Sequence, residues 1–165
     1  MIGKFLKTYL ETNGTILTCP YTPLLSSGTP TKIYLDNVPT NAANNVISIH
    51  EVVSTTQRPT FWNGVTNPSE VRSSVVLLYV RSKMSSDGTV GAISDGDWVN
   101  IVQSAEAIRD AINRISMATY SDSNGTYIID QVRPVSGSNF DHQDSQGRNI
   151  YLLRFTATYT WNSSI

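Results

Sequence analysis

The sequence is poor in the residues that build most catalytic and metal sites. Its 165 residues include a single cysteine, Cys19, and only two histidines, His50 and His142. One cysteine excludes an intramolecular disulfide framework and a cysteine-rich zinc site. No stretch approaches the roughly 20 apolar residues that span a bilayer, and the lysines near the first residue are not followed by the apolar segment of a signal peptide. We therefore expect no membrane association and synthesis in the cytoplasm.

Charge is scarce as well. Only 15% of residues are charged and the net charge is -1, which excludes a generic nucleic-acid binder because such proteins carry a basic excess. Residues 1–83 carry 7 basic and 4 acidic side chains, a net of +3, and residues 84–165 carry 5 and 9, a net of -4. Either this asymmetry is chance, or the subunit has unlike-charged faces that favour head-to-tail association.

Small neutral polar residues are abundant instead, with 20 Ser, 18 Thr and 13 Asn. Such residues favour turns and strand edges over long helices. The length suits one domain, residues 1–165, that is large enough to bury its own hydrophobic core.

Two segments have the apolar periodicity of amphipathic helices. The first stripe consists of Ile2, Phe5, Leu6, Tyr9 and Leu10, and the second of Trp98, Ile101, Ala105, Ile108, Ile112 and Ile115. Asn13-Gly14 is a suitable stop for the first helix, and Ser94 with Asp97 resembles a capping box for the second. The second stripe predicts a helix laid on a sheet.

Five segments are predicted to be strands, at residues 32–35, 45–53, 71–81, 126–133 and 148–161. The third is the longest and most apolar, which indicates a central strand, and the last two are predicted to pair as a hairpin. The fold class is therefore α+β, with a mixed, mostly antiparallel sheet of about five strands and two helices. Three long polar loops, at 54–70, 82–96 and 134–147, are of a length that tends to be functional or disordered.

No motif in the chain predicts a catalytic residue, a metal or a cofactor. His50 falls within a strand pattern, which favours a hydrogen-bonded or edge-facing side chain. His142 has Asp141 and Asp144 as neighbours, but two carboxylates and one imidazole are a weak metal site. Asn124-Gly125 indicates a turn before the next strand. Nucleophile elbows, phosphate-binding glycine loops and zinc-protease motifs are missing from the sequence.

Candidate partner-binding residues lie in the long loops. Arg58, Phe61 and Trp62 share one loop, and Phe140 and His142 share another. Exposed Trp and Arg side chains dominate the binding energy of many interfaces, so these five residues are the candidates for contact with a partner. The alternative is that the first loop packs over the domain's own core.

The order of these segments resembles the tail terminator (tail completion, minor capsid) proteins of long-tailed bacteriophages. The resemblance is carried by the helix at 5–10, the segment Ile33-Tyr34-Leu35-Asp36-Asn37-Val38-Pro39, the apolar strand with Glu51, the strand that ends at Val80-Arg81, the helical pattern Ala105-Ile108-Arg109-Ala111-Ile112 and the final Phe-x-Ala-x-Tyr strand between Tyr151 and Trp161. It covers nearly the whole chain and consists mostly of apolar patterning.

The resemblance implies a structural role in the virion and no enzymatic activity. Such proteins form a ring, usually a hexamer, that caps the finished tail tube and contacts the neck or head-completion protein. The genome DNA passes through the lumen without sequence-specific binding. Two alternatives stay open. One is another neck or tail-tube component, and the other is a small hydrolase or nucleotide-binding enzyme with a site built on the loops.

Overall fold

The computed structural model describes residues 2–12, 32–40, 42, 46–57, 69–81, 95–135, 139–143 and 148–163. Within these ranges the chain forms helices α1 (Ile2–Thr12) and α3 (Asp95–Asn113) and strands β1 (Lys32–Leu35), β2 (Val46–Gln57), β3 (Ser69–Arg81), β4 (Ser116–Asp122), β5 (Gly125–Pro134), β6 (Asn139–Gln143) and β7 (Asn149–Ser163). The predicted α+β class is confirmed.

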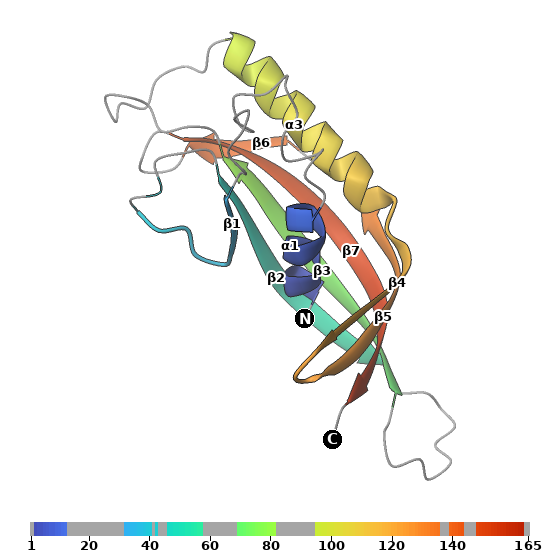
Figure 1. Ribbon diagram of the computed structural model, residues 1–165. Coiled ribbons are helices and arrows are strands. Elements are labelled where there is room, and N and C mark those ends of the chain that lie inside the picture. Colours follow the sequence, from blue (N-terminus) through green and yellow to red (C-terminus); the bar gives the residue numbers. More distant parts are fainter. Residues whose placement is uncertain are drawn as a thin grey trace.

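The seven strands form one sheet in the order β1-β2-β3-β7-β5-β4, with β6 paired to the start of β7 (Figure 1). Every neighbouring pair is antiparallel except β1 and β2, which are parallel. The predicted central position of β3 and the predicted pairing of β5 with β7 are both confirmed. The last strand in the sequence therefore lies in the middle of the sheet.

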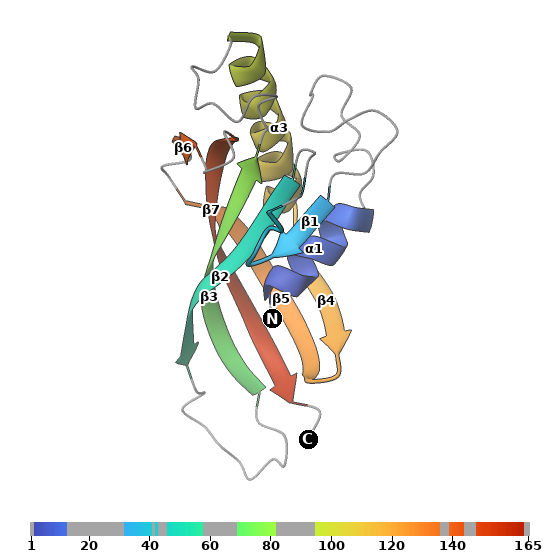
Figure 2. The ribbon, with the colours of Figure 1, turned by 90° about the vertical axis from the view of Figure 1, so that its left-hand side faces the viewer.

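Both helices cover the same face of the sheet. The buried side of α1, with Ile2, Leu6 and Leu10, and that of α3, with Ile108 and Ile112, join one apolar cluster with alternate residues of β2, β3, β5 and β7. The Tyr9 hydroxyl also donates a hydrogen bond of 3.3 Å to the carbonyl of Ala111, which ties the two helices together. Figure 2 shows the bend of the long strands and α1 lying beside β1.

A carboxylate on the sheet completes the start of α1. The backbone N–H of Gly3 donates to Glu51 Oε2 at 3.3 Å, and the hydroxyl of Ser74 donates to Glu51 Oε1 at 2.9 Å. Ser74 is fully buried and also lies 3.2 Å from the hydroxyl of Tyr159. Because the first N–H groups of a helix have no partner within the helix and carry a partial positive charge, a carboxylate there is favourable.

The boundaries of all three predicted loops were wrong. Residues 54–57 extend β2, residues 69 and 70 begin β3, residues 95 and 96 begin α3, and residues 139–143 form β6. The rest of the loops at 54–70 and 134–147 falls mostly outside the described residues, as do residues 82–94 of the third loop. The sheet has seven strands in place of about five, because β4 and β6 were not predicted.

Candidate functional site: the outer face of the sheet

We call the side of the sheet opposite α1 and α3 the outer face. No described helix or strand lies over its centre, where alternate residues of β3 reach the surface. Val71 is 38% exposed, and Val75, Leu77 and Tyr79 are half-buried, whereas Ser74, Val76 and Leu78, which face the helices, are buried. A row of apolar side chains that a subunit leaves uncovered is typical of a protein-binding surface.

The outer face is also basic. Strand register places four cations on it, Lys32 on β1, Arg81 on β3, Arg133 on β5 and Arg154 on β7. Two carboxylates lie on the same side, Asp36 after β1 and Asp130 at the irregularity of β5.

Arg133 and Arg154 form the centre of this basic surface. Arg133 pairs with Thr156, which is two residues beyond Arg154 on the same face of β7, so the two guanidinium groups are diagonal neighbours. Both side chains are exposed, and neither makes an ion pair with any of the described residues. Two like charges side by side repel each other, and an acidic partner would relieve that repulsion.

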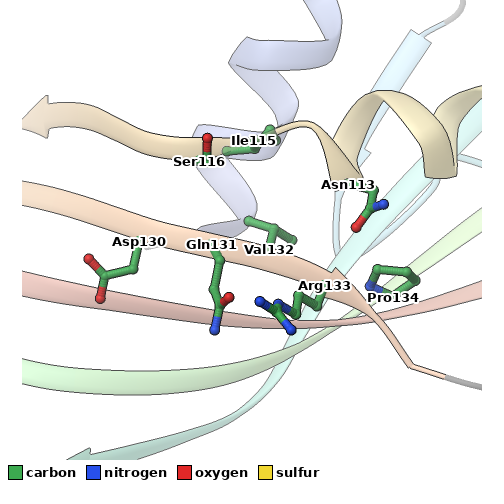
Figure 3. Close-up of a pocket in the computed structure, with 8 residues that line it drawn as sticks. All are labelled: Asn113, Ile115, Ser116, Asp130, Gln131, Val132, Arg133 and Pro134. Atoms are coloured by element: carbon green, nitrogen blue, oxygen red, sulfur yellow. The ribbon is translucent and has the colours of Figure 1, made fainter.

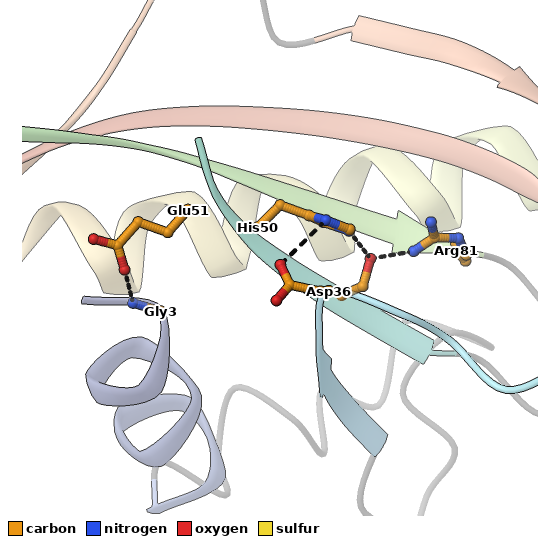
Figure 4. Close-up of polar contacts among 6 residues, drawn as sticks. Gly3, Asp36, His50, Glu51 and Arg81 are labelled. Carbon is orange, nitrogen blue, oxygen red and sulfur yellow. Dashed lines mark hydrogen bonds and ion pairs between the residues drawn. The ribbon is translucent and has the colours of Figure 1, made fainter. Parts of the chain in front are cut away.

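A polar cluster joins β1, β2 and β3 on the outer face (Figure 4). His50 Nε2 lies 3.1 Å from the hydroxyl oxygen of Ser48, and Arg81 donates a hydrogen bond to the same oxygen. His50 Nδ1 lies 3.6 Å from Asp36 Oδ1, and the imidazole packs edge-on against the ring of Tyr79. The expectation of a hydrogen-bonded His50 is confirmed.

Ser48, His50 and Asp36 have the connectivity of a serine hydrolase triad, in which a base links a hydroxyl to a carboxylate. Two features oppose that chemistry. Ser48 is fully buried, and its oxygen already accepts a hydrogen bond from Arg81. Ser48 also lies within two strand pairings, with Tyr34 and with Tyr79, which occupy the backbone donors that an oxyanion hole would need. The arrangement therefore ties three strands together.

His50 is neutral at ordinary pH. Burial lowers the pKa of its imidazole below the usual value, and Arg81 lowers it further, while Asp36 acts in the opposite direction. At 3.6 Å the contact with Asp36 is too long for a normal hydrogen bond. The packing against Tyr79 and the contact with Ser48 consequently hold the ring in place.

A shallow hollow of about 390 Å³ opens where β4 leaves β5 (Figure 3). Its lining consists of Asn113, Ile115, Ser116, Asp130, Gln131, Val132, Arg133 and Pro134. In Figure 3 the side chains of Asp130 and Arg133 lie at separate positions along β5, with Gln131 between them. The hollow therefore has one acidic and one basic group, and its Arg133 belongs to the outer face as well.

The residues that the sequence singled out fall into two groups. Phe140 and His142 belong to β6, which pairs with the start of β7. Arg58, Phe61 and Trp62 lie outside the described residues, as does Cys19.

The described residues next to these two groups lie at opposite ends of the sheet. Asn139 on β6 is in register with Leu152, whereas the first residue of β3, Ser69, pairs with Asn162. At roughly 3.3 Å per residue these ten positions correspond to about 30 Å.

Arg133 and Arg154 were not among the candidate residues predicted from the sequence. A signal was present in β7, where the exposed Arg154 lies between Leu153 and Phe155, both fully buried. This alternation indicates a strand with one face outside the core.

The outer face is the main candidate site among the described residues. Among the described residues no group of three His, Cys, Asp or Glu side chains could hold a metal ion, and neither described helix is long and apolar enough to cross a bilayer. A comparison with protein-family models finds no match, and a comparison with curated proteins finds none either. Fold and site thus define a two-layer α+β protein with one half-apolar, basic sheet face.

Proposed function

We propose that this chain is a structural subunit of the ring that ends the tail tube of a long-tailed bacteriophage and joins the tail to the neck. The observation that carries the proposal is the outer face, where apolar residues of β3 and the arginines Arg133 and Arg154 have no covering layer within the described subunit. Such a surface suits a protein that works by contact with other subunits. The order of elements that resembles the tail terminator proteins supports the same role.

The ring would contact different partners above and below, namely the tube protein and the neck or head-completion protein. The separation of β6 from the junction of β2 and β3 supports two such contacts, since about 30 Å of sheet lies between them. A tube polymer presents the same edge after every added ring, so a different subunit must cover that edge to stop growth. The genome would pass through the lumen without sequence-specific contacts, and the protein would be located at the neck of the virion.

The decisive experiment compares virions made with and without the gene. In its absence we expect filled capsids, unattached tails and tubes of uncontrolled length in electron micrographs. Infectious particles with tails of normal length would refute the terminator role. A different neck or tube component is distinguished by the same images, because its loss would leave capsids unable to retain DNA or would leave no tubes.

Docking of the subunit on the tail tube should depend on the candidate partner-binding residues of the loops. Replacement of Trp62 by Ala is expected to weaken binding of the subunit to tail tubes by about 1–3 kcal/mol if the side chain is an interface hot spot. Binding of purified subunit to isolated tubes, followed by sedimentation, measures the effect. An unchanged melting temperature of the variant shows that the loss comes from the interface, and unchanged binding would remove Trp62 from it.

The second candidate is a small hydrolase, which the contact of Ser48 with His50 and the position of Asp36 favour. A fluorophosphonate probe tests it, because only an activated serine forms the covalent adduct. Labelling that disappears in the Ser48→Ala variant would establish the hydrolase. With Ser48 fully buried, we expect no labelling of the native protein.

A further inference from the structure

Helix α3, on the side of the sheet opposite the outer face, carries more carboxylates than cations. The nineteen residues of this helix include four carboxylates and one arginine. Ala105, Ile108 and Ile112 face the core, whereas Asp110 is exposed and Glu106 is half-exposed. Glu106 forms an ion pair with Arg109 at 2.6 Å, which neutralises the charge of Glu106 within the helix. Among the described residues Asp110 has no such ion pair.

Asp110 is an exposed carboxylate near the end of α3. It lies in the last turn of the helix, where the negative end of the helix dipole disfavours another negative charge. Among the described residues no cation forms an ion pair with it. A cation of another molecule placed beside Asp110 would offset this unfavourable interaction.

We infer that the outer face of one copy docks on α3 of a second copy, with Arg133 and Arg154 near the second copy's Asp110. The inference rests on the proposed function, because it names the contact that would build the ring. The two surfaces lie on opposite sides of the sheet, so the contact is head-to-tail and can repeat from copy to copy. Opposite charges on the two surfaces direct this pairing and disfavour the pairing of like faces.

The outer face suits a protein better than a nucleic acid. Val71, Leu77 and Tyr79 run along β3, and Arg154 on the neighbouring β7 is in register with Leu77, so the surface combines apolar and charged side chains. This is the composition of a protein interface, whereas phosphate-binding surfaces are strongly basic throughout. The chain as a whole has a net charge of -1, so a second copy is not repelled.

A charge swap tests the inference. Sedimentation of the full chain at rising concentration should show self-association that weakens with added salt, because salt screens exposed charges. Arg154→Glu and Asp110→Arg should each lower the association constant about tenfold or more, because each places like charges opposite one another. The double variant, with both changes in one chain, should recover part of the loss, since a glutamate at 154 then faces an arginine at 110 while Arg133 is unchanged.

Arg114→Glu is the matched control, because it reverses an exposed charge at the end of α3 and makes that side more acidic. It should associate at least as well as the native chain, and a cooperative melting transition in every variant shows that the fold is retained. Three results would overturn the inference. The native chain stays monomeric, the single substitutions leave the association constant unchanged, or the double variant associates more weakly than either single variant. Binding of duplex DNA by the native outer face without self-association would overturn it as well. The terminator role itself is judged separately by virion morphology.

Discussion

Glu51 connects the two layers of the fold. One carboxylate oxygen accepts the N–H of Gly3 at the start of α1, and the other accepts the hydroxyl of the buried Ser74. Its removal leaves a helix N–H and a buried hydroxyl without their charged acceptor. Hydrogen bonds to charged groups contribute more than neutral ones, and an unsatisfied buried group adds a desolvation cost.

Glu51→Ala should therefore lower the free energy of unfolding by about 1–2 kcal/mol. Urea denaturation followed by circular dichroism measures the change. Glu11→Ala is the matched control, because Glu11 lies on α1 but makes only an exposed ion pair with Lys7 at 3.7 Å, which is worth at most about 0.5 kcal/mol. Equal effects of the two substitutions would show that Glu51 does not cap the helix.

His50 should make the folded state sensitive to acid. Its pKa is lowered in the folded protein, mainly by burial, so on acidification the unfolded chain binds a proton first. Stability is then complete above the unfolded pKa of about 6.5 and falls as the pH decreases from there toward the lower folded pKa. His50→Gln should flatten the melting temperature between pH 7 and pH 5. A melting temperature of the native protein that rises as the pH is lowered from 7 to 5 would contradict this role of His50.

At the scale of elements, the β4–β5 hairpin depends on one glycine. The turn at Ser123 and Asn124 is held by the N–H of Asn124, which donates to Asp122 Oδ1 at 2.8 Å. Gly125 follows with a φ of 145°, and a Cβ placed there would lie 2.2 Å from the carbonyl oxygen of Asn162 on β7. The predicted turn at Asn124-Gly125 is confirmed, and the close approach of β7 explains why it needs glycine.

Gly125→Ala should cost about 2–3 kcal/mol, because it combines a disfavoured φ with a backbone clash. Thermal unfolding measures the loss. Gly3→Ala is the matched control, since a Cβ there meets only the ends of side chains at 3.5 Å or more, and alanine is favoured in a helix. The control should leave stability unchanged or raise it slightly, and equal losses at both sites would contradict the role given to Asn162.

The two helices and five of the strands were predictable because each buries part of its residues in a regular pattern. The missed strand β4 has no such face. Only Ala118 and Tyr120 pack partly against the core, and Met117 is 75% exposed. Because β4 lies at the edge of the sheet, its strand conformation depends on pairing with β5. The periodicity of its own sequence does not reveal that pairing. The five residues of β6 likewise depend on their pairing with β7.

The candidate site was less predictable than the fold. The contact of Ser48 with His50 is local, but Asp36 and Arg81 reach them only through the register of β1 and β3 with β2. The neighbourhood of Arg133 and Arg154 depends on an irregularity in β5 between Ile129 and Gln131. A one-residue change in register moves a side chain to the other face, so sequence patterning could not place these charges together.

For the whole molecule, the position of β7 decides how the chain can fold. This strand pairs with β3 over thirteen positions and with β5 along its other edge. It also supplies Leu153, Phe155, Ala157 and Tyr159 to the core, all at most 2% exposed. Within the described sheet β7 is the one strand that connects β1–β3 to the hairpin of β4 and β5.

A chain that ends at residue 148 should consequently fail to fold. Loss of a single buried aromatic or aliphatic side chain costs about 2–5 kcal/mol, and the loss of four with two strand ladders exceeds the total stability of a typical domain, about 5–15 kcal/mol. We expect no cooperative melting transition in the truncated chain and recovery of one when a synthetic peptide of residues 149–163 is added. The same peptide with Phe155→Asp should not restore folding, because it buries an unpaired charge, whereas Arg154→Ala should restore it, because Arg154 is exposed. Cooperative unfolding of the truncated chain alone would show that the first three strands and the hairpin hold together without β7.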